Sequence, residues 1–123
     1  QDFSIEKIGI LNDGVNLVVL VNQGTGGAAE AFAAALRDMG GATLIGARTS
    51  GSGSSNMYME LNNGSALYIP TSRWFTTGGL SLLGDGLKPD EEAALTEQDI
   101  SLGRDSQLNA AYNHLDGLLP DYR

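Results

Sequence analysis

The fold is decided by the stretch LVVLVN (residues 17–22), QGTGG (23–27), AAEAFAAALRDMGG (28–41) and ATLIGAR (42–48). In this order they predict a strand, a glycine turn, a helix and a second strand. The run 17–21 is continuously apolar and rich in β-branched residues, which is typical of a strand buried on both faces, as in a parallel sheet. A strand, helix and strand joined this closely form a right-handed parallel crossover in nearly all known cases. The stretch therefore predicts an α/β fold with a parallel β-α-β unit.

Three glycines, Gly24, Gly26 and Gly27, stand where the first strand must turn into the helix. Glycines at this density indicate positive φ angles or the close approach of another group to the backbone. We therefore expect any function of the chain to lie at this turn. The glycines also fit a simpler role, in which they only allow the helix to pack closely on the sheet of an otherwise inert domain.

The helix after the turn is predicted from apolar residues at the spacing i, i+3, i+4 and i+7, namely Phe32, Ala35, Leu36 and Met39. Its alanines permit close packing on a sheet, and Gly40-Gly41 is a stop signal. The second strand is expected at residues 42–47.

Downstream of this unit, residues 49–56 (TSGSGSSN) predict a flexible loop. Residues 57–61 and 66–71 predict a β-hairpin, because Asn63-Gly64 between them favours a tight turn. The second hairpin strand is expected to continue through residues 72–75. Three aromatic side chains in this region would line either the core or a partner surface: Tyr68, Trp74 and Phe75.

Residues 76–90 hold four glycines and one proline and predict a surface loop. The acids that follow are dense as far as Asp105, which indicates a solvated face or a negatively charged helix start. A final helix is predicted from the capping residues Asp105-Ser106 and should end before Gly117, with its apolar side chains at Leu108, Ala111, Tyr112 and Leu115. Residues 1–16 fit a strand and a helical turn equally well.

The bulk composition predicts a single domain over residues 1–123, because this length supports one core and not two. Fifteen acidic and seven basic residues give a net charge of −8, which argues against nucleic acid or an anionic membrane as a partner. The absence of cysteine excludes disulfides and thiolate metal sites, and no apolar run of about 20 residues predicts membrane insertion. The chain begins at Gln1, which suggests a processed or excised segment. Composition leaves the compartment and the oligomeric state open.

The glycine turn also satisfies the pattern G-x-G-x-x-A from Gly24 to Ala29, between a strand and a helix, as a dinucleotide-binding turn requires. Arg48, at the end of the next strand, could meet a 2′-phosphate. This module stays an alternative, because the further βα units that it needs are replaced by a hairpin. No metal site is predicted, since the single histidine, His114, has no paired ligand motif and is expected to face solvent.

The order of these motifs resembles the C-terminal half of the catalytic domain of the C-terminal processing, or tail-specific, serine peptidases. In that family a strand ending V-N leads into G-S-A-S-A-S-E and a helix, as Val21-Asn22 leads into GTGGAAE here. Further resemblances follow in family order, at residues 46–56 (G-E-K-T-F-G-K-G-S-V-Q in the family), 63–75 (hairpin), 84–90 (G-K-G-I-E-P-D) and 105–108 (D-x-Q-L). The resemblance covers about residues 16–116 and implies a crotonase-like or ClpP-like fold.

The same resemblance implies that the catalytic positions of this chain have all changed. The nucleophilic serine of the family falls on Gly27, its general-base lysine on Ser52, and the glutamine that orients the lysine on Asn56. A serine hydroxyl is not a useful base at pH 7, so no catalytic residue is expected. Peptide or oxyanion binding by backbone amides would survive the loss, at Gly26, Gly27 and Ala28.

The function implied by the resemblance is a tail-specific peptidase-like domain that is catalytically inactive and keeps at most a peptide-binding or interaction role. Its partner would be a peptide or a protein C-terminus, and no cofactor is expected. An active serine-type peptidase, completed by segments or partners absent here, is a further alternative. Because the family acts mainly in the bacterial periplasm or cell envelope and in plastids, an envelope location is implied by the resemblance alone.

Overall fold

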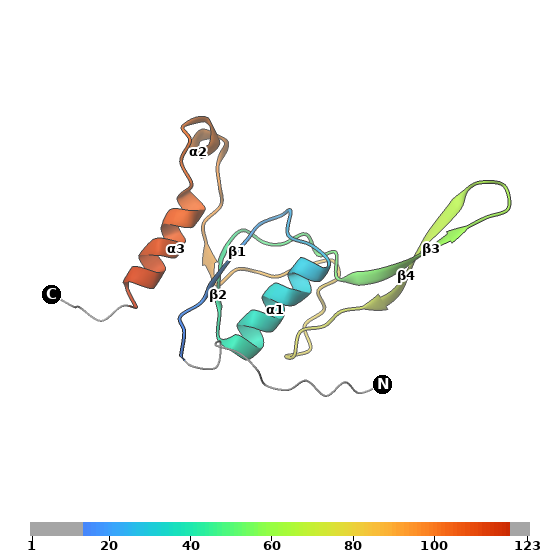
Figure 1. Cartoon of the computed structure of the whole chain (residues 1–123), viewed down its shortest axis with the longest axis horizontal. Helices are drawn as coiled ribbons and strands as arrows, with labels where there is room; N and C mark the ends of the chain where they lie inside the picture. Colours follow the sequence, from blue (N-terminus) through green and yellow to red (C-terminus); the bar gives the residue numbers. More distant parts are fainter. Residues whose placement is uncertain (1–13, 119–123) are drawn as a thin grey trace.

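The computed structural model describes residues 14–118, which form a small parallel sheet with helices packed on it and a long hairpin that projects from one side (Figure 1). The sheet has the order β1-β2-β5, with β1 at Val18–Val21, β2 at Thr43–Gly46 and β5 at Glu91–Glu92. Both pairings are parallel. The prediction of an α/β fold with a parallel β-α-β unit is thus confirmed, whereas most of the ambiguous segment 1–16 lies outside the described residues.

Helix α1 (Ala28–Gly40) connects β1 to β2, and helix α3 (Ser106–Asp116) contacts both strands. Leu44 and Ile45 of β2 are both fully buried, although adjacent strand residues point to opposite faces. The sheet is therefore covered on both faces at its central strand. The predicted cap of the last helix is confirmed, because the Asp105 carboxylate accepts a hydrogen bond from the Leu108 amide at 2.8 Å.

The face that α1 turns toward the core differs from the predicted one. Its buried residues are Glu30, Ala33 and Ala34, whereas Phe32 is 65% and Met39 is 75% exposed. The small side chains let the helix backbone lie close to the sheet, which leaves the bulky residues on the outer side. The predicted end of the helix is confirmed at its glycines, with Gly41 in the left-handed conformation at φ 67°.

Strand β1 is less buried than its apolar sequence predicts. Val21 is 2% exposed, but Leu20 on the opposite face is 39% exposed. Within residues 14–118, β1 pairs only with β2 and lies at the edge of the sheet. The prediction of a strand buried on both faces is therefore wrong at Leu20.

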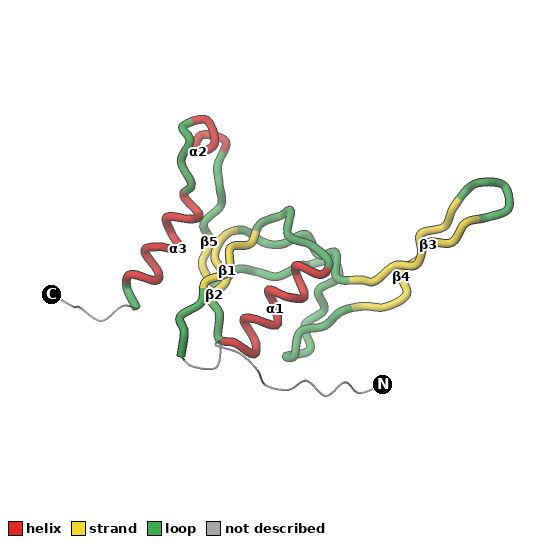
Figure 2. The backbone as a smooth tube through the Cα atoms, viewed as in Figure 1, coloured by secondary structure: helices red, strands yellow, loops and turns green. Residues whose placement is uncertain are grey.

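The predicted hairpin is present as β3 (Ser54–Glu60) and β4 (Ala66–Arg73), an antiparallel pair that extends away from the sheet (Figure 2). Tyr68 is 71% and Phe75 is 60% exposed, so neither belongs to the core. Trp74, in contrast, packs against the buried cluster, and its indole N–H donates to Ser55 Oγ at 2.9 Å. Of the three aromatic residues singled out above, only Trp74 contributes to the core.

Residues 49–56 do not form the expected flexible loop. Gly51 and Gly53 are buried, and the Gly84 amide donates to the Gly51 carbonyl at 2.9 Å. A Cβ at Gly53 would lie 2.4 Å from Leu82, so the two segments are in direct backbone contact. The segment 76–90 likewise does more than cover the surface, because it supplies two fully buried side chains to the core, Leu82 and Leu87.

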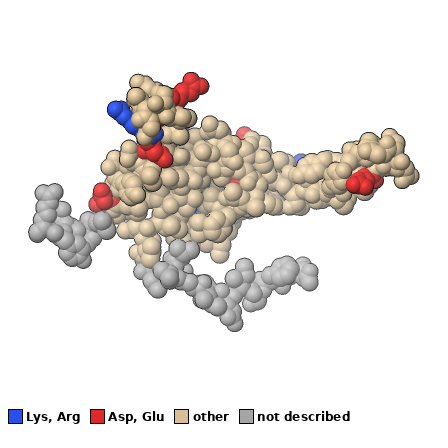
Figure 3. All heavy atoms as spheres, turned by 45° about the horizontal axis from the view of Figure 1, so that its top comes forward, with Lys and Arg blue, Asp and Glu red and all other residues tan. Residues whose placement is uncertain are grey.

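The acidic region contains two short elements, the strand β5, which the sequence pattern did not predict, and the helix α2 (Glu97–Ser101). Thr96 and Asp99 form a reciprocal capping box at the start of α2. The expectation of a charged helix start is thus confirmed at α2. Acidic side chains gather around this end of the molecule, whereas few charged atoms lie along the hairpin (Figure 3).

Candidate functional site

The turn between β1 and α1 is held by reciprocal bonds between Asn22 and Thr25. The Thr25 amide donates to the Asn22 carbonyl at 2.8 Å, and the Asn22 amide donates to the Thr25 hydroxyl at 3.1 Å. The Asn22 side chain also accepts from the Gly24 amide at 2.9 Å. These local contacts explain how the chain reverses within a few residues before the helix begins.

Gly27 is the N-cap residue that precedes α1, and it has φ 57° and ψ −125° and no side-chain cap. Side chains of L residues rarely adopt this conformation, and it resembles the strained strand-to-helix turn that presents a nucleophilic serine in other hydrolases. A Cβ at Gly27 would meet no atom within 4 Å. The backbone therefore presents an open position at which a side chain would have room but none is present.

At the other two glycines of the turn, Gly24 and Gly26, side chains of other residues approach the backbone closely. A Cβ at Gly26 would lie 2.3 Å from Ser50 Oγ, and one at Gly24 would lie 3.2 Å from the side-chain oxygen of Asn22. The prediction of positive φ or close approach is confirmed, with the positive φ confined to Gly27.

Ser50 and Ser52 bring two hydroxyl groups to the turn. The Ser50 amide donates to the Thr25 carbonyl at 2.9 Å, and the two Oγ atoms lie 2.8 Å apart. Ser52 Oγ would also lie 3.2 Å from a Cβ at Gly26. The structure thus places Ser52, the position of the family lysine, directly beside the turn.

The side chain of Asn56 contacts hairpin residues and not the glycine turn. It follows a β-bulge after Ser55, and its side chain donates to the Tyr68 hydroxyl at 3.4 Å and accepts from Ser54 Oγ at 3.4 Å. Both contacts keep it on the hairpin. Of the three positions that the resemblance singled out, the structure places Ser52 beside Gly26, the neighbour of Gly27, and keeps Asn56 on the hairpin.

Glu30 is a residue of this region that sequence analysis missed. It is 0% exposed, and one carboxylate oxygen accepts from the Gly51 amide at 2.8 Å and from the Thr49 hydroxyl. A signal for its burial was present, since Glu30 stands three and four residues before Ala33 and Ala34 and shares their helix face. Periodicity that counts only large apolar residues does not detect such a face.

The basic side chains within residues 14–118 make their hydrogen bonds and ion pairs away from the glycine turn. His114 lies 3.4 Å from the Glu91 carboxylate and is 27% exposed, so the prediction that it faces solvent is only partly right. Lys88 pairs with Glu92 at 3.7 Å, and Arg48 donates to the Asp85 carbonyl at 3.1 Å. None of these contacts supplies a base to Ser50 or Ser52.

Residues 14–118 contain no group of three or more histidine and acidic side chains that could hold a metal ion. The helices in the same range are all too short or too polar to cross a bilayer.

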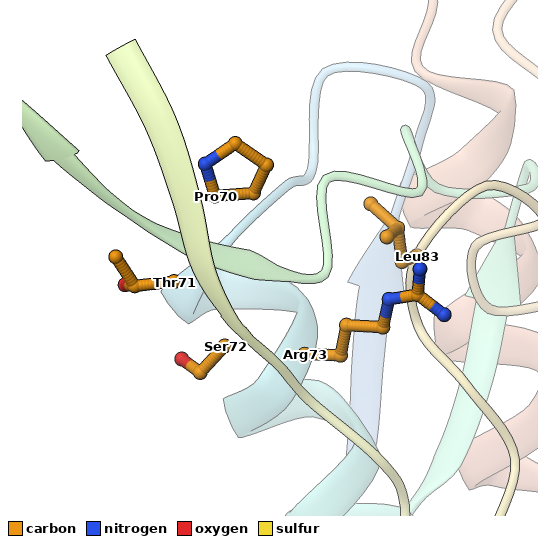
Figure 4. A pocket seen from close by; sticks show the side chains of 5 residues that line it. All are labelled: Pro70, Thr71, Ser72, Arg73 and Leu83. Carbon is orange, nitrogen blue, oxygen red and sulfur yellow. The ribbon is translucent and has the colours of Figure 1, made fainter.

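A separate hollow of about 200 Å³ lies beside the base of β4 (Figure 4), and it is lined by Pro70, Thr71, Ser72, Arg73 and Leu83. The Arg73 side chain extends toward Leu83 and is the charged group of its lining. No residue of the glycine turn contributes to it.

Comparison with known proteins identifies the family of the chain. A family model described as peptidase family S41 matches residues 6–93. The chain belongs to peptidase family S41. Among its relatives, the carboxy-terminal-processing protease of Bartonella bacilliformis is 37% identical over 103 residues, which cover 79% of this chain and 24% of that protein. The chloroplastic carboxyl-terminal-processing peptidase 3 of Arabidopsis thaliana is 42% identical over 74 residues, which cover 60% and 14%.

Solved S41-like structures agree with the fold. The photosystem II D1 C-terminal processing protease superposes with a TM-score of 0.58 at 34% identity, over 66% of this chain and 21% of that one. The tricorn protease gives a TM-score of 0.69 at 22% identity, over 81% of this chain and 10% of that one, and shows likeness of fold alone. The S41 chain described here spans between 14% and 24% of the length of the two relatives named above.

These matches confirm the predicted resemblance to C-terminal processing peptidases. They give no support to the alternative of a dinucleotide-binding module, although Gly24 to Ala29 satisfy its pattern.

Proposed function

We propose that this S41 chain is a catalytically inactive peptidase-like domain that binds the C-terminal end of a peptide or protein. The observation that carries the proposal is Gly27, which keeps the backbone conformation suited to a nucleophile but has no side chain. Removal of the nucleophile abolishes covalent catalysis, whereas the backbone amides of the turn do not depend on it. Binding without cleavage is the activity that such a turn can retain.

The remaining hydroxyl groups near the turn support inactivity. The Thr25 hydroxyl accepts the Asn22 amide, and the hydroxyls of Ser50 and Ser52 contact each other. A serine or threonine hydroxyl needs an adjacent base to become a nucleophile. The recorded contacts of His114 and Lys88 are with acids instead.

The first turn of α1 supports binding of a carboxylate or a carbonyl oxygen at residues 26–28. Amides in the first turn of a helix lack acceptors within the helix, and the helix dipole favours negative charge there. The room above Gly27 would admit the end of a peptide chain. Family members bind extended tails against a sheet edge, and within residues 14–118 β1 lies at the edge of the sheet and runs directly into this turn. The parallel sheet is consistent with a crotonase-like or ClpP-like arrangement, and an envelope location would fit the same function.

Peptide binding tests the proposal. A fluorescein-labelled, alanine-rich peptide with a free C-terminal carboxylate should bind in fluorescence anisotropy, and its C-terminally amidated twin should bind about tenfold more weakly. Gly27→Val should abolish binding, because the side chain fills the open position.

A matched control separates this effect from backbone strain. Gly64, in the hairpin turn, also has a positive φ of 80° and open space around it. Gly64→Val should cost similar stability and leave the peptide affinity unchanged. Equal affinity in the wild type and in a folded Gly27→Val variant would place the ligand elsewhere and refute the proposal.

A further inference from the structure

The most unusual buried group outside the turn is the carboxylate of Glu30. Ionisable side chains are seldom fully buried unless they are paired, and no cation contacts this one among its recorded interactions. Its Oε1 atom accepts two hydrogen bonds, from the Gly51 amide and from the Thr49 hydroxyl. Its Oε2 atom is buried and has no partner among the described residues. Two loop donors therefore hold this side chain.

Thr49 extends the contact to a third segment. Its Oγ1 atom accepts the Leu87 amide at 2.7 Å, and its own amide donates to the Leu87 carbonyl at 3.1 Å. A Cβ at Gly86 would lie 2.5 Å from the Thr49 carbonyl oxygen, so the two loops touch through their backbones. We call the four residues Glu30, Thr49, Gly51 and Leu87 the Glu30 cluster; it joins α1 to both loops.

The Glu30 cluster holds both sequence neighbours of Ser50, the residue that lies against the turn. Ser50 stands between Thr49 and Gly51, both of which bond to Glu30. Its amide reaches the Thr25 carbonyl at 2.9 Å, and its hydroxyl contacts Ser52 Oγ. Because Thr49 and Gly51 are both held by Glu30, the hydroxyls of Ser50 and Ser52 keep a fixed position relative to the glycine turn.

We propose that Glu30 is a positioning residue of the binding site: through Thr49 and Gly51 it holds the Ser50 and Ser52 hydroxyls beside Gly26, where they form the polar wall that a bound peptide end contacts. This role rests on the proposed binding of a peptide at residues 26–28.

Paired substitutions test the proposal. Glu30→Ala and Thr49→Val remove the hydrogen bonds, and each should weaken binding of the free-carboxylate peptide about tenfold, in line with the loss of a buried hydrogen bond. Glu30→Gln keeps a carbonyl oxygen at the Oε1 position, and Thr49→Ser keeps the hydroxyl. Both conservative variants should bind within about threefold of the wild type. Thr49→Val provides an independent arm if Glu30→Ala does not fold.

Amide hydrogen exchange supplies a readout that does not depend on the peptide. The Ser50 amide, which bonds to Thr25, should exchange about tenfold faster in Glu30→Ala and Thr49→Val, while the β1–β2 ladder keeps its protection. Ala111→Gly serves as the stability control, since Ala111 is buried on α3. It should lower global stability without changing the relative exchange of Ser50 or the peptide affinity.

The outcomes separate the two proposals. Unchanged Ser50 exchange in both Glu30→Ala and Thr49→Val would show that the Glu30 cluster does not fix the loop. Faster Ser50 exchange with unchanged affinity would show that the fixed hydroxyls do not serve the ligand. Absence of peptide binding by the wild-type chain would refute the proposed function itself, and the exchange of Ser50 would then still decide whether Glu30 holds the loop.

Discussion

The side-chain amide of Gln107 donates a hydrogen bond to the backbone carbonyl of Val21 at 2.8 Å and so ties α3 to the last residue of β1. The same nitrogen lies 3.4 Å from the Ile45 carbonyl oxygen of β2. A Cβ at Gly46 would lie 1.9 Å from this Gln107 nitrogen, so only glycine at position 46 leaves room for the Gln107 side chain. Gln107 therefore fastens the final helix across two strands, just before the chain enters the glycine turn.

Replacing Gln107 should destabilise the whole domain. Gln107→Ala removes a buried donor from two strand carbonyls and should lower the free energy of unfolding by about 1–3 kcal/mol. Gln107→Glu should cost more, because a buried carboxylate would face carbonyl oxygens. Urea denaturation followed by circular dichroism measures both. Gln98→Ala, at an exposed position in α2, is the matched control and should change stability by less than about 0.5 kcal/mol. Equal stabilities for the two alanine variants would contradict this role.

The open position at Gly27 predicts that a nucleophile can be restored. Gly27→Ser should fold with a backbone cost of about 1–3 kcal/mol, but should not react with a fluorophosphonate probe, because the Ser52 hydroxyl is not a base. Gly27→Ser combined with Ser52→Lys should be labelled at least about 100-fold faster, the usual contribution of a general base. Mass spectrometry of the labelled peptide identifies the reacting residue. Labelling of the wild-type chain at Ser50 or Ser52 would instead reveal a displaced nucleophile and refute inactivity.

Local features of this chain were predictable because neighbouring residues determine them. The conformation of the glycine turn at Gly27, the cap at Asp105 and the hairpin around Gly64 each depend on a few adjacent residues. The candidate site at Gly26, Gly27 and Ala28 could be proposed from the same local pattern, because the three residues are adjacent in one turn, and its binding role stays a prediction.

Contacts between distant segments were not predictable from periodicity. Glu30 meets Gly51 and Gln107 meets Val21 only after the chain has folded. The alanines at positions 33 and 34 mark the helix face that Glu30 shares, but no local pattern names its partner in the loop. The packing face of α1 was missed because alanines achieve close contact with the sheet, whereas Phe32 and Met39 are larger but lie outside. Loop 49–56 was misjudged since its glycines serve backbone contact rather than flexibility.

Truncating a side chain in the core should lower the free energy of unfolding much more than truncating one on the hairpin. Leu44 is 0% exposed at the centre of the sheet, so Leu44→Ala should lose about 2–5 kcal/mol of unfolding free energy. Tyr58 pairs with Tyr68 across the hairpin but is 63% exposed, so Tyr58→Ala should lose less than about 1 kcal/mol. Thermal and urea unfolding of the two variants measure this difference. A loss for Tyr58→Ala as large as that for Leu44→Ala would show that the hairpin packs against something more than its own strands.

Acid should weaken a contact between α1 and the loop after the hairpin. The Asp38 carboxylate accepts from the Thr77 hydroxyl at 2.9 Å and from the Thr77 amide at 3.2 Å. The Thr77 hydroxyl is the main cause that lowers the pKa of Asp38 below its usual value of 3.8, and the Arg37 guanidinium at 3.3 Å adds to it. The hydroxyl and amide of Thr96 lower the pKa of Asp99 in the same direction.

Because the folded state lowers both of these pKa values, the stabilisation is present in full above the unfolded value near 3.8 and is lost as the pH falls through the folded values. The urea midpoint of the wild type should therefore fall between about pH 5 and pH 2, and Asp38→Asn should reduce that fall. Asp85→Asn is the control, since the recorded contact of Asp85 is through its backbone carbonyl and its side chain is exposed. Identical pH profiles for wild type and Asp38→Asn would show that the contact with Thr77 contributes nothing to stability in solution.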